Sequence, residues 1–403
     1  MEVARKSRNT SNGDIPALAS DPNFAENWAN SNVLAFYPAS KIIVVTVGNE
    51  VVTLPDQNLA SQLVPAMQNV QNALNAASLG GKIKVSTVHS MAVLSQSEPP
   101  SAGAFGYGDT MKGLLQFLST NGAPLMINPY PFFAYRDDPR PETKAFCLFQ
   151  PNAGRLDSNT GIKYMNMWDA QVHFYTYIHV YALMCLSTTI HSALKAAGYK
   201  DVEIVVAETG WPYKGDSNEV GTNMENAKAY NGNLINRLRS KVGTPLMPGK
   251  SVDTYIFALY DEDMKLGPAS ERSFGLFKPD LSATYDVNLA KTTQTPTRST
   301  NPAAPTINPV PSPVVVGWCL PRPGVSDAQL QANLDYACGQ GIGCGPGGAC
   351  FEPATVASHA AYAMNLFYQS SSRNSGDCDF LQTAAVTSTN PSYGSCAYPV
   401  WST

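Results

Sequence analysis

Charged side chains are scarce in this sequence, and basic residues do not cluster. Only 14% of the 403 residues are Asp, Glu, Lys or Arg, and 27 basic against 31 acidic side chains give a formal net charge of −4. Phosphate recognition needs clustered Lys and Arg, so we expect no nucleic-acid partner. A hydrophobic content of 44% is enough for a folded core, which argues against general disorder.

Several cofactor motifs are also missing. No Gly-rich phosphate turn, dinucleotide fingerprint or His-Glu-x-x-His motif occurs, the five histidines show no ligand spacing, and the cysteines lack paired C-x-x-C spacing. The sequence therefore predicts no metal and no cofactor.

Cysteine is sparse in the first 317 residues, where only Cys147 and Cys185 occur, and dense afterwards. The later six are Cys319, Cys338, Cys344, Cys350, Cys378 and Cys396. Such a set indicates a three-disulfide module and an oxidising compartment. Yet Met1–Asn12 has no apolar segment typical of a signal peptide. We therefore expect a parent protein that is secreted, at the cell wall or cell surface, and a chain that lacks the parent's front.

Composition changes sharply between Lys291 and Gly317, a stretch with six prolines and six threonines. Such a segment favours extended structure and builds no core. We interpret it as a linker (291–317) between a large first domain (1–290) and a small cysteine-rich domain (318–403).

The first domain alternates strand-like and helix-like segments. Nearly continuous apolar runs predict five buried parallel strands: Lys41–Glu50, Lys82–Ser90, Pro124–Pro131, Val202–Gly210 and Val252–Tyr260. Helical segments such as Asn58–Ala77 and Asn223–Lys241 lie between them. This alternation predicts an α/β fold with a parallel sheet.

Polar residues follow the strands, where a (β/α)8 barrel places its chemistry: Asn49, Glu50, His89, Asn128, Tyr130, Glu208, Asp261 and Glu262. A closed barrel needs eight strands, and the sequence yields five. Either the sheet is open or the sequence has lost its first units.

Glu50 and Glu208 each end a strong run of buried valines. Burying a carboxylate is costly unless the group is paired or used. Two such groups facing one cleft are what glycoside hydrolysis requires, whereas two structural ion pairs explain the placement equally well.

Local motifs favour the first interpretation. They are VGNE (Val47–Glu50), PPSAGAF (Pro99–Phe105), NPYPFFAY (Asn128–Tyr135), VVAETGWP (Val205–Pro212) and ERSFGLFKPD (Glu271–Asp280). In this order they resemble the plant endo-1,3-β-glucanases of glycoside hydrolase family 17, from about Asn12 to Leu289. The resemblance implies a (β/α)8 TIM barrel of which strands four to eight are present, an N-terminal truncation.

The resemblance also implies roles for site residues. Glu50 matches the acid/base and Glu208 the nucleophile of a retaining mechanism, with carboxyls roughly 5–5.5 Å apart. Asn49 matches the residue that bonds the sugar 2-hydroxyl. Further charged positions match residues that shape the cleft, or else form a solvated loop network: Glu262, Lys265 and Glu271. Three aromatic side chains stack on sugar or pack in the core: Tyr130, Tyr135 and Trp211.

Residues Ala170–Leu194 are 25 consecutive positions without Asp, Glu, Lys or Arg, but their histidines and hydroxyls argue against a membrane span. The wider segment Ile162–Ala197 lacks Gly and Pro and predicts one long helix. Related sequences pass almost directly from a motif like MWDAQV to one like HSALKAAGY, so His173–Ile190 is interpreted as an insert from a gene-model error.

The tail from Trp318 to Pro399 resembles the X8 domain, or carbohydrate-binding module family 43. That resemblance implies the disulfides Cys319–Cys378, Cys338–Cys396 and Cys344–Cys350, and β-1,3-glucan binding. Candidate sugar platforms that serve equally well as core residues are Tyr362, Tyr368 and Tyr393.

Two functions follow as hypotheses. The first is retaining endo-hydrolysis of 1,3-β-D-glucosidic linkages in callose- or laminarin-like glucan by a monomer. The alternative is a non-catalytic β-1,3-glucan-binding protein, because an incomplete barrel leaves strand edges unpaired.

Overall fold

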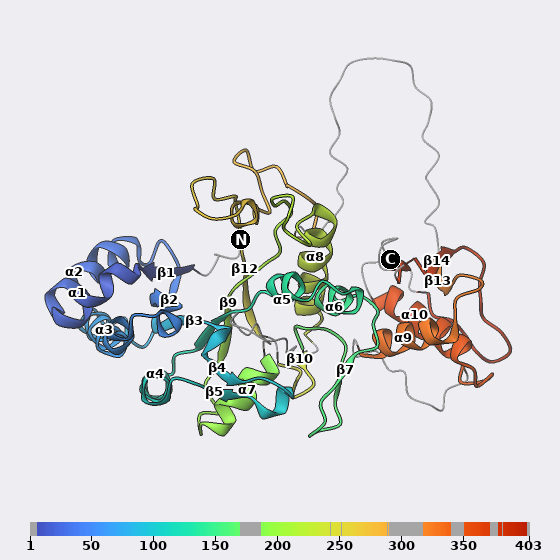
Figure 1. The fold of residues 1–403 in the computed structure, drawn as a ribbon, viewed down its shortest axis with the longest axis horizontal. Coiled ribbons are helices and arrows are strands. Elements are labelled where there is room, and N and C mark those ends of the chain that lie inside the picture. Colours follow the sequence, from blue (N-terminus) through green and yellow to red (C-terminus); the bar gives the residue numbers. More distant parts are fainter. Residues whose placement is uncertain are drawn as a thin grey trace, which may run out of the picture.

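Six parallel strands form the sheet on which the first domain is built. The computed structural model describes residues 6–169, 187–241, 243–250, 252–287, 289, 317–339, 350–370, 378–380 and 382–400. The sheet is curled, like half of a barrel, and has the order β1-β2-β3-β6-β9-β12 (Figure 1). Its strands are β1 (Lys6–Thr10), β2 (Ile42–Asn49), β3 (Lys84–Ser90), β6 (Leu125–Asn128), β9 (Ile204–Thr209) and β12 (Asp253–Ile256).

All five predicted strands are present and parallel, but the predicted number is one too low. β1 pairs in parallel with β2, with Arg8 opposite Val45 and Thr10 opposite Val47. Its sequence, KSRNT, has no apolar run, because an edge strand is stabilised by its partner's backbone rather than by burial on both faces. The prediction of strands four to eight alone is therefore wrong. Across the described residues the sheet is open, with β1 and β12 at its edges, and does not close into an eight-stranded barrel.

Helices cover one face of the sheet. They are α1 (Ile15–Ser20), α2 (Pro22–Asn32), α3 (Gln57–Ala76), α4 (Gly108–Asn121), α5 (Pro131–Asp137), α6 (Pro141–Cys147), α7 (Ser187–Ala196) and α8 (Met224–Ser240). Short 3-10 turns occur at Asn12–Asp14, Leu34–Phe36, Val51–Thr53, Met91–Val93, Pro100–Ala102 and Ala269–Arg272. Small antiparallel ribbons are β4 (Leu94–Gln96) with β5 (Ala104–Phe105), β7 (Arg155–Leu156) with β8 (Lys163–Tyr164), and β10 (Gly243–Thr244) with β11 (Met247–Pro248).

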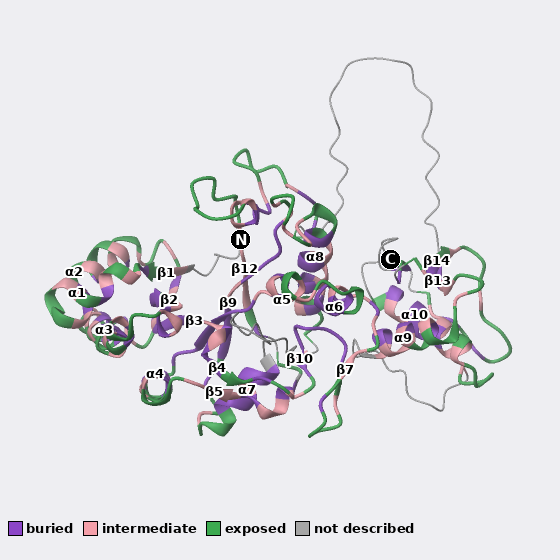
Figure 2. Cartoon of the chain, in the orientation of Figure 1, coloured by how far each residue is buried: buried purple, intermediate pink, exposed green. Residues whose placement is uncertain are grey.

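The two faces of the sheet pack differently. Strand residues that join the helix-facing core include Val45, Val47, Val85, Ile127 and Val206. Four adjacent strands each contribute one residue to a separate layer on the other face: Val44, Val88, Met126 and Val205. The helices bury one side and expose the other, as Figure 2 shows in purple and green. Burial on both faces explains why these strands read as continuous apolar runs.

Helix α3 shows how the sequence specifies one covering helix. The Asp56 side chain accepts a hydrogen bond from Leu59 N (3.0 Å) and so caps the first turn. Its buried stripe follows the helical period and consists of Leu63, Met67, Val70 and Leu74. The predicted helices Asn58–Ala77 and Asn223–Lys241 are thus confirmed as α3 and α8.

The prediction of one helix over Ile162–Ala197 is wrong. Lys163–Tyr164 forms β8 in a ribbon with β7, and the described helix in this segment begins at Ser187. The absence of Gly and Pro permits a helix but does not impose one when a neighbouring strand supplies hydrogen bonds. Residues 170–186, including Cys185 and most of the proposed insert, lie outside the described residues. The insert's last residue, Ile190, is fully buried in the core.

The C-terminal module packs two helices against a two-stranded sheet, at the far end of the molecule from α1–α3 (Figure 1). Its elements are β13 (Trp318–Pro321), α9 (Asp327–Gly339), α10 (Val356–Ser370) and β14 (Ala384–Thr387). It touches the first domain through an ion pair between Lys163 and Asp335, 2.7 Å long. The predicted linker lies outside the described residues except for Gly317.

Disulfides tie this module together, but two of the three predicted bonds are wrong. Cys319 and Cys378 form the first bond, as the resemblance implied. Cys350 bonds Cys396, at a Cα–Cα distance of 4.5 Å. This bond rules out both Cys338–Cys396 and Cys344–Cys350, because each cysteine forms one disulfide. Cys338 is also in a disulfide.

Peptide mapping tests the corrected pairing. Proteolysis without reduction is expected to release a peptide pair joined by Cys350–Cys396, which separates after reduction. Recovery of Cys338 joined to Cys396 would contradict the structure. The Cys319–Cys378 peptide, common to both pairings, serves as the internal control.

Candidate active site

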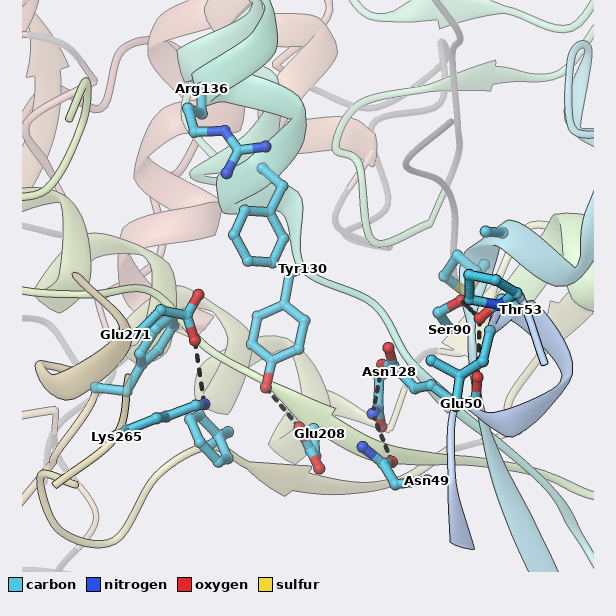
Figure 3. Close-up of a pocket in the computed structure, with 17 residues that line it drawn as sticks. Asn49, Glu50, Thr53, Ser90, Asn128, Tyr130, Arg136, Glu208, Lys265 and Glu271 are labelled. Carbon is cyan, nitrogen blue, oxygen red and sulfur yellow. Dashed lines mark hydrogen bonds and ion pairs between the residues drawn. The ribbon is translucent and has the colours of Figure 1, made fainter. Parts of the chain in front are cut away.

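Residues from the ends of four strands line one cleft of 590 Å³. The register places Ser90 of β3 opposite Asn128 of β6 and Asn49 of β2 opposite Val88. Because parallel strands end at the same edge, their last side chains converge there. Lining residues are Asn49, Glu50, Thr53, Leu54, Pro55, Ser90, Met91, Ala92, Asn128, Tyr130, Phe133, Arg136, Glu208, Phe257, Lys265, Glu271 and Phe274 (Figure 3).

Glu50 occupies a tight turn directly after β2. Its backbone is left-handed (φ 58°), which is uncommon for a residue with a side chain. Two hydrogen bonds hold the turn: Glu50 N donates to Val88 O (2.8 Å), and Thr53 Oγ1 donates to Glu50 O (2.9 Å). The turn therefore fixes the direction in which the carboxyl leaves the strand.

The segment that follows β1 clamps the residues preceding Glu50. Asn12 Nδ2 donates to Asn49 O (3.0 Å), and Asn49 N donates to Asn12 Oδ1 (2.7 Å). Gly48 N donates to Thr10 Oγ1 at 3.1 Å. Asn12 and Thr10 thus continue the β1–β2 pairing with side chains where the regular strand pairing has ended.

Asn128 joins the two residues of the Asn-Glu pair. Its Nδ2 donates to Glu50 Oε1 (2.9 Å) and to Asn49 Oδ1 (3.2 Å) (Figure 3). Burial raises the pKa of Glu50, while the Asn128 hydrogen bond and the positive charge of Lys265 act in the opposite direction. The net result is a carboxyl that holds its proton to a higher pH than usual.

Glu208 follows the buried valines of β9 and receives a hydrogen bond from Tyr130. The Tyr130 hydroxyl donates to Glu208 Oε2 at 2.8 Å. Burial raises the pKa of Glu208, the Tyr130 bond lowers it, and the negative charge of Glu50 raises it again. The charge of Glu50 therefore acts on the carboxyl of Glu208 at the same cleft.

Lys265 supplies a positive charge at the same cleft. Its ammonium lies 3.1 Å from Glu271 Oε2 and 3.5 Å from Glu262 Oε2. Lys265 and Glu271 line the cleft, whereas Glu262 is exposed and lies outside the lining. The predicted charged group is therefore assembled, with Glu262 at its periphery.

Tyr130, which was singled out from the sequence, belongs to an aromatic wall together with three phenylalanines that were not singled out. Tyr130 packs against Phe133, Phe257 and Phe274, with ring centroids 5.5, 6.2 and 5.8 Å away. Phe133 and Phe274 lie within the quoted motifs NPYPFFAY and ERSFGLFKPD, which was the available signal. Flat apolar rings suit the apolar faces of sugars.

Trp211 and Tyr135 do not join this wall. Trp211 is 0% exposed, and its indole N–H donates to Gly221 O. Tyr135 stacks on Trp211 instead of lining the cleft. The prediction that Trp211 binds sugar is wrong, because core packing encloses it.

His89, another polar residue of a strand end, is fully buried, and this burial lowers its pKa to about 4.

In the C-terminal module, the three candidate platforms differ in exposure. Tyr368 is a core residue and Tyr362 packs edge-on against Tyr398, whereas Tyr393 is 39% exposed.

Over the described part of the chain, no group of three or more His, Cys, Asp or Glu side chains could hold a metal ion.

Comparison with known sequences identifies the class of protein. Residues 6–289 match the model for glycosyl hydrolases family 17, and residues 317–385 match the X8 domain. The chain therefore belongs to glycosyl hydrolase family 17 and is a glycosyl hydrolase carrying an X8 domain.

Particular relatives are similar over nearly the whole chain. A glucan endo-1,3-β-D-glucosidase of Olea europaea is 66% identical, covering 96% of this chain and 81% of its own length. Glucan endo-1,3-β-glucosidase 7 of Arabidopsis thaliana is 62% identical, with coverages of 96% and 73%.

A solved structure shares the fold of the first domain. A β-1,3-glucanase and allergen of Cryptomeria japonica pollen is 39% identical, with a TM-score of 0.62 over 70% of this chain and 82% of that one. In the part of the present chain that is described, no helix has the length and apolar character to cross a membrane.

A substitution at Gly48 tests the packing behind the turn that carries Glu50. Its φ is +70°, and an added Cβ would lie 2.8 Å from side-chain carbons of both Ile15 and Val51. Gly48→Ala is expected to lower the free energy of unfolding by about 1–3 kcal/mol, since strain and overpacking combine. Urea denaturation measures the change. At Gly81, with nothing within 4 Å, the same substitution should cost less than about 0.5 kcal/mol, and equal losses would contradict this account.

Proposed function

We propose that this chain hydrolyses internal 1,3-β-D-glucosidic linkages of β-1,3-glucan with retention of configuration. The observation that carries the proposal is the pair of half-buried carboxyls, Glu50 and Glu208, at one cleft with different hydrogen-bond donors. Two carboxyls in distinct environments are what acid–base and nucleophilic roles require. The names of the Olea europaea and Arabidopsis thaliana relatives supply the substrate class.

Each carboxyl takes a separate role in the two chemical steps. Glu50, whose raised pKa favours the protonated form, gives its proton to the glycosidic oxygen as the bond to the anomeric carbon breaks. Glu208 attacks that carbon and forms an ester. A water molecule, deprotonated by Glu50, then releases the sugar and regenerates both groups.

The surroundings of Glu208 favour its role as nucleophile. Tyr130 stabilises the carboxylate and directs one oxygen, while the charge of Lys265 lowers the pKa of both Glu208 and Glu50. Because Glu50 and Glu208 repel each other when both are ionised, one proton is retained by the pair over a range of pH. That state is the one in which an acid and a nucleophile coexist.

The remaining cleft residues suit a glucan chain. We assign sugar contacts to Asn49, Tyr130 and the Lys265–Glu271 pair, and glucan binding to the X8 domain, with exposed Tyr393 as its platform. Disulfides in that domain support a secreted protein of the cell wall or surface. The monomeric state and the boundaries 1–290, 291–317 and 318–403 stay predictions.

Substitution of the nucleophile tests the proposed function. Glu208→Gln removes the attacking charge with little change in shape, so laminarin hydrolysis by this chain should fall by about 10³-fold or more. Reducing-end release measures the rate. Glu203→Gln, at an exposed position just before β9, is the matched control and should retain activity.

Measuring laminarin binding alongside laminarin hydrolysis distinguishes a hydrolase from the alternative, a glucan-binding protein without activity. A wild-type chain that binds laminarin but releases no reducing ends would favour a glucan-binding protein without catalysis. Equal activity of Glu208→Gln and the wild type would contradict the role of Glu208.

The pH profile tests the Tyr130 hydrogen bond. Tyr130→Phe removes a donor that lowers the pKa of Glu208, so that pKa should rise. Activity requires ionised Glu208, and it is lost as the pH falls through this pKa. The acidic limb of kcat/KM should therefore move to higher pH, with a loss of about 10–100-fold in rate.

A buried tyrosine outside the cleft serves as control for this variant. Tyr285 accepts a hydrogen bond from Asn231 and is 7% exposed. Tyr285→Phe should leave the acidic limb unmoved. An unchanged limb in Tyr130→Phe would remove Tyr130 from the mechanism.

A further inference from the structure

Asn128 lies at the end of β6, and its side chain contacts Asn49 and Glu50 at the end of β2. Strand β3 lies between β2 and β6 in the sheet. Its side chain is nearly inaccessible (4% exposed) and lines the cleft. The amide nitrogen lies 2.9 Å from Glu50 Oε1 and 3.2 Å from Asn49 Oδ1. One carboxamide therefore bridges the side chains of consecutive residues that point into the same cleft (Figure 3).

The hydrogen-bonding chemistry fixes the orientation of this amide. A carboxamide nitrogen has two N–H donors, and here each has an oxygen acceptor. Rotating the amide by 180° would replace both bonds by contacts between oxygens. Asn128 Oδ1, by contrast, is buried and has no hydrogen-bond partner among the described residues. The nitrogen side therefore accounts for the position of the side chain.

The bond to Glu50 also distinguishes the two oxygens of its carboxyl. A protonated carboxyl accepts hydrogen bonds better at its carbonyl oxygen than at its hydroxyl oxygen. With Asn128 donating to Oε1, the proton of the acid form resides on Oε2. Oε2 is then the atom that delivers the proton to a departing oxygen.

We propose that Asn128 is a positioning residue for Glu50, held in place by its second hydrogen bond to Asn49, and that it aligns the Oε2 proton of Glu50 with the leaving oxygen. This inference rests on the proposed acid role of Glu50. It assigns Asn128 no contact with the reacting atoms. Its effect is expected wherever proton donation by Glu50 limits the rate.

Leaving groups of different basicity test this assignment. A sugar leaving group needs the proton of Glu50, whereas a 2,4-dinitrophenolate leaves without one. For Asn128→Ala, kcat/KM on laminari-oligosaccharides should fall by about tenfold, the size expected from losing one hydrogen bond that aligns the acid. On a 2,4-dinitrophenyl β-laminaribioside, kcat/KM should fall by less than about threefold.

Asn231 offers a matched control. It is also buried, donates one hydrogen bond to the Tyr285 hydroxyl (2.9 Å), has a buried Oδ1 without a described partner, and lies outside the cleft lining. Asn231→Ala should change kcat/KM by the same factor on both substrates, because only the amount of folded protein changes. Equal losses on both substrates for Asn128→Ala would overturn the proposal.

A titration that needs no turnover provides the second readout. The Asn128 bond lowers the pKa of Glu50, so Asn128→Ala should raise the pH midpoint of the Glu50 carboxyl, followed by ¹³C NMR with Glu50→Gln to assign the signal. An unmoved midpoint would overturn the proposal. If the wild-type chain hydrolyses neither substrate, the proposed function fails, and this midpoint alone decides the role of Asn128.

Discussion

Partial burial of two carboxyl groups at one edge of a parallel sheet is the constraint on which the site depends. A carboxyl that is partly removed from water needs a hydrogen-bond donor, and β6 leads to one for each. Asn128 ends that strand and serves Glu50, while Tyr130 follows two residues later and serves Glu208. Side chains two residues apart on an extended chain point to the same face. One short segment therefore donates a hydrogen bond to each of the two carboxyls.

Backbone geometry supports this arrangement from the other side. The left-handed conformation of Glu50 is unfavourable by itself, so the surrounding contacts must stabilise it. Those contacts come from Asn12, which binds the backbone of Asn49, and from Thr53, which binds the carbonyl of Glu50. The strand that sequence reasoning overlooked, β1, leads directly to Asn12. A polar edge strand thus contributes to the geometry of the cleft.

Hydrophobic patterning predicted the four inner strands that are covered on both faces, namely β2, β3, β6 and β9, and also the apolar run of the edge strand β12. β1 was missed because KSRNT carries no apolar signal, and the long helix over Ile162–Ala197 failed because composition does not register the β7–β8 ribbon. Family motifs contained both carboxyls and also Asn128 and Tyr130, but they did not indicate which of these two residues donates to which carboxyl. The disulfide pairing and the burial of Trp211 depend on three-dimensional packing, which spacing along a sequence does not encode.

The configuration of the first product tests the central claim most directly, namely that Glu50 and Glu208 act as acid/base and nucleophile in a double displacement. Proton NMR of laminari-oligosaccharide hydrolysis, recorded before mutarotation, distinguishes the anomers. The account predicts that the β-anomer accumulates first, because two displacements at the anomeric carbon restore its configuration. Initial accumulation of the α-anomer would contradict it, since that outcome requires direct attack by water.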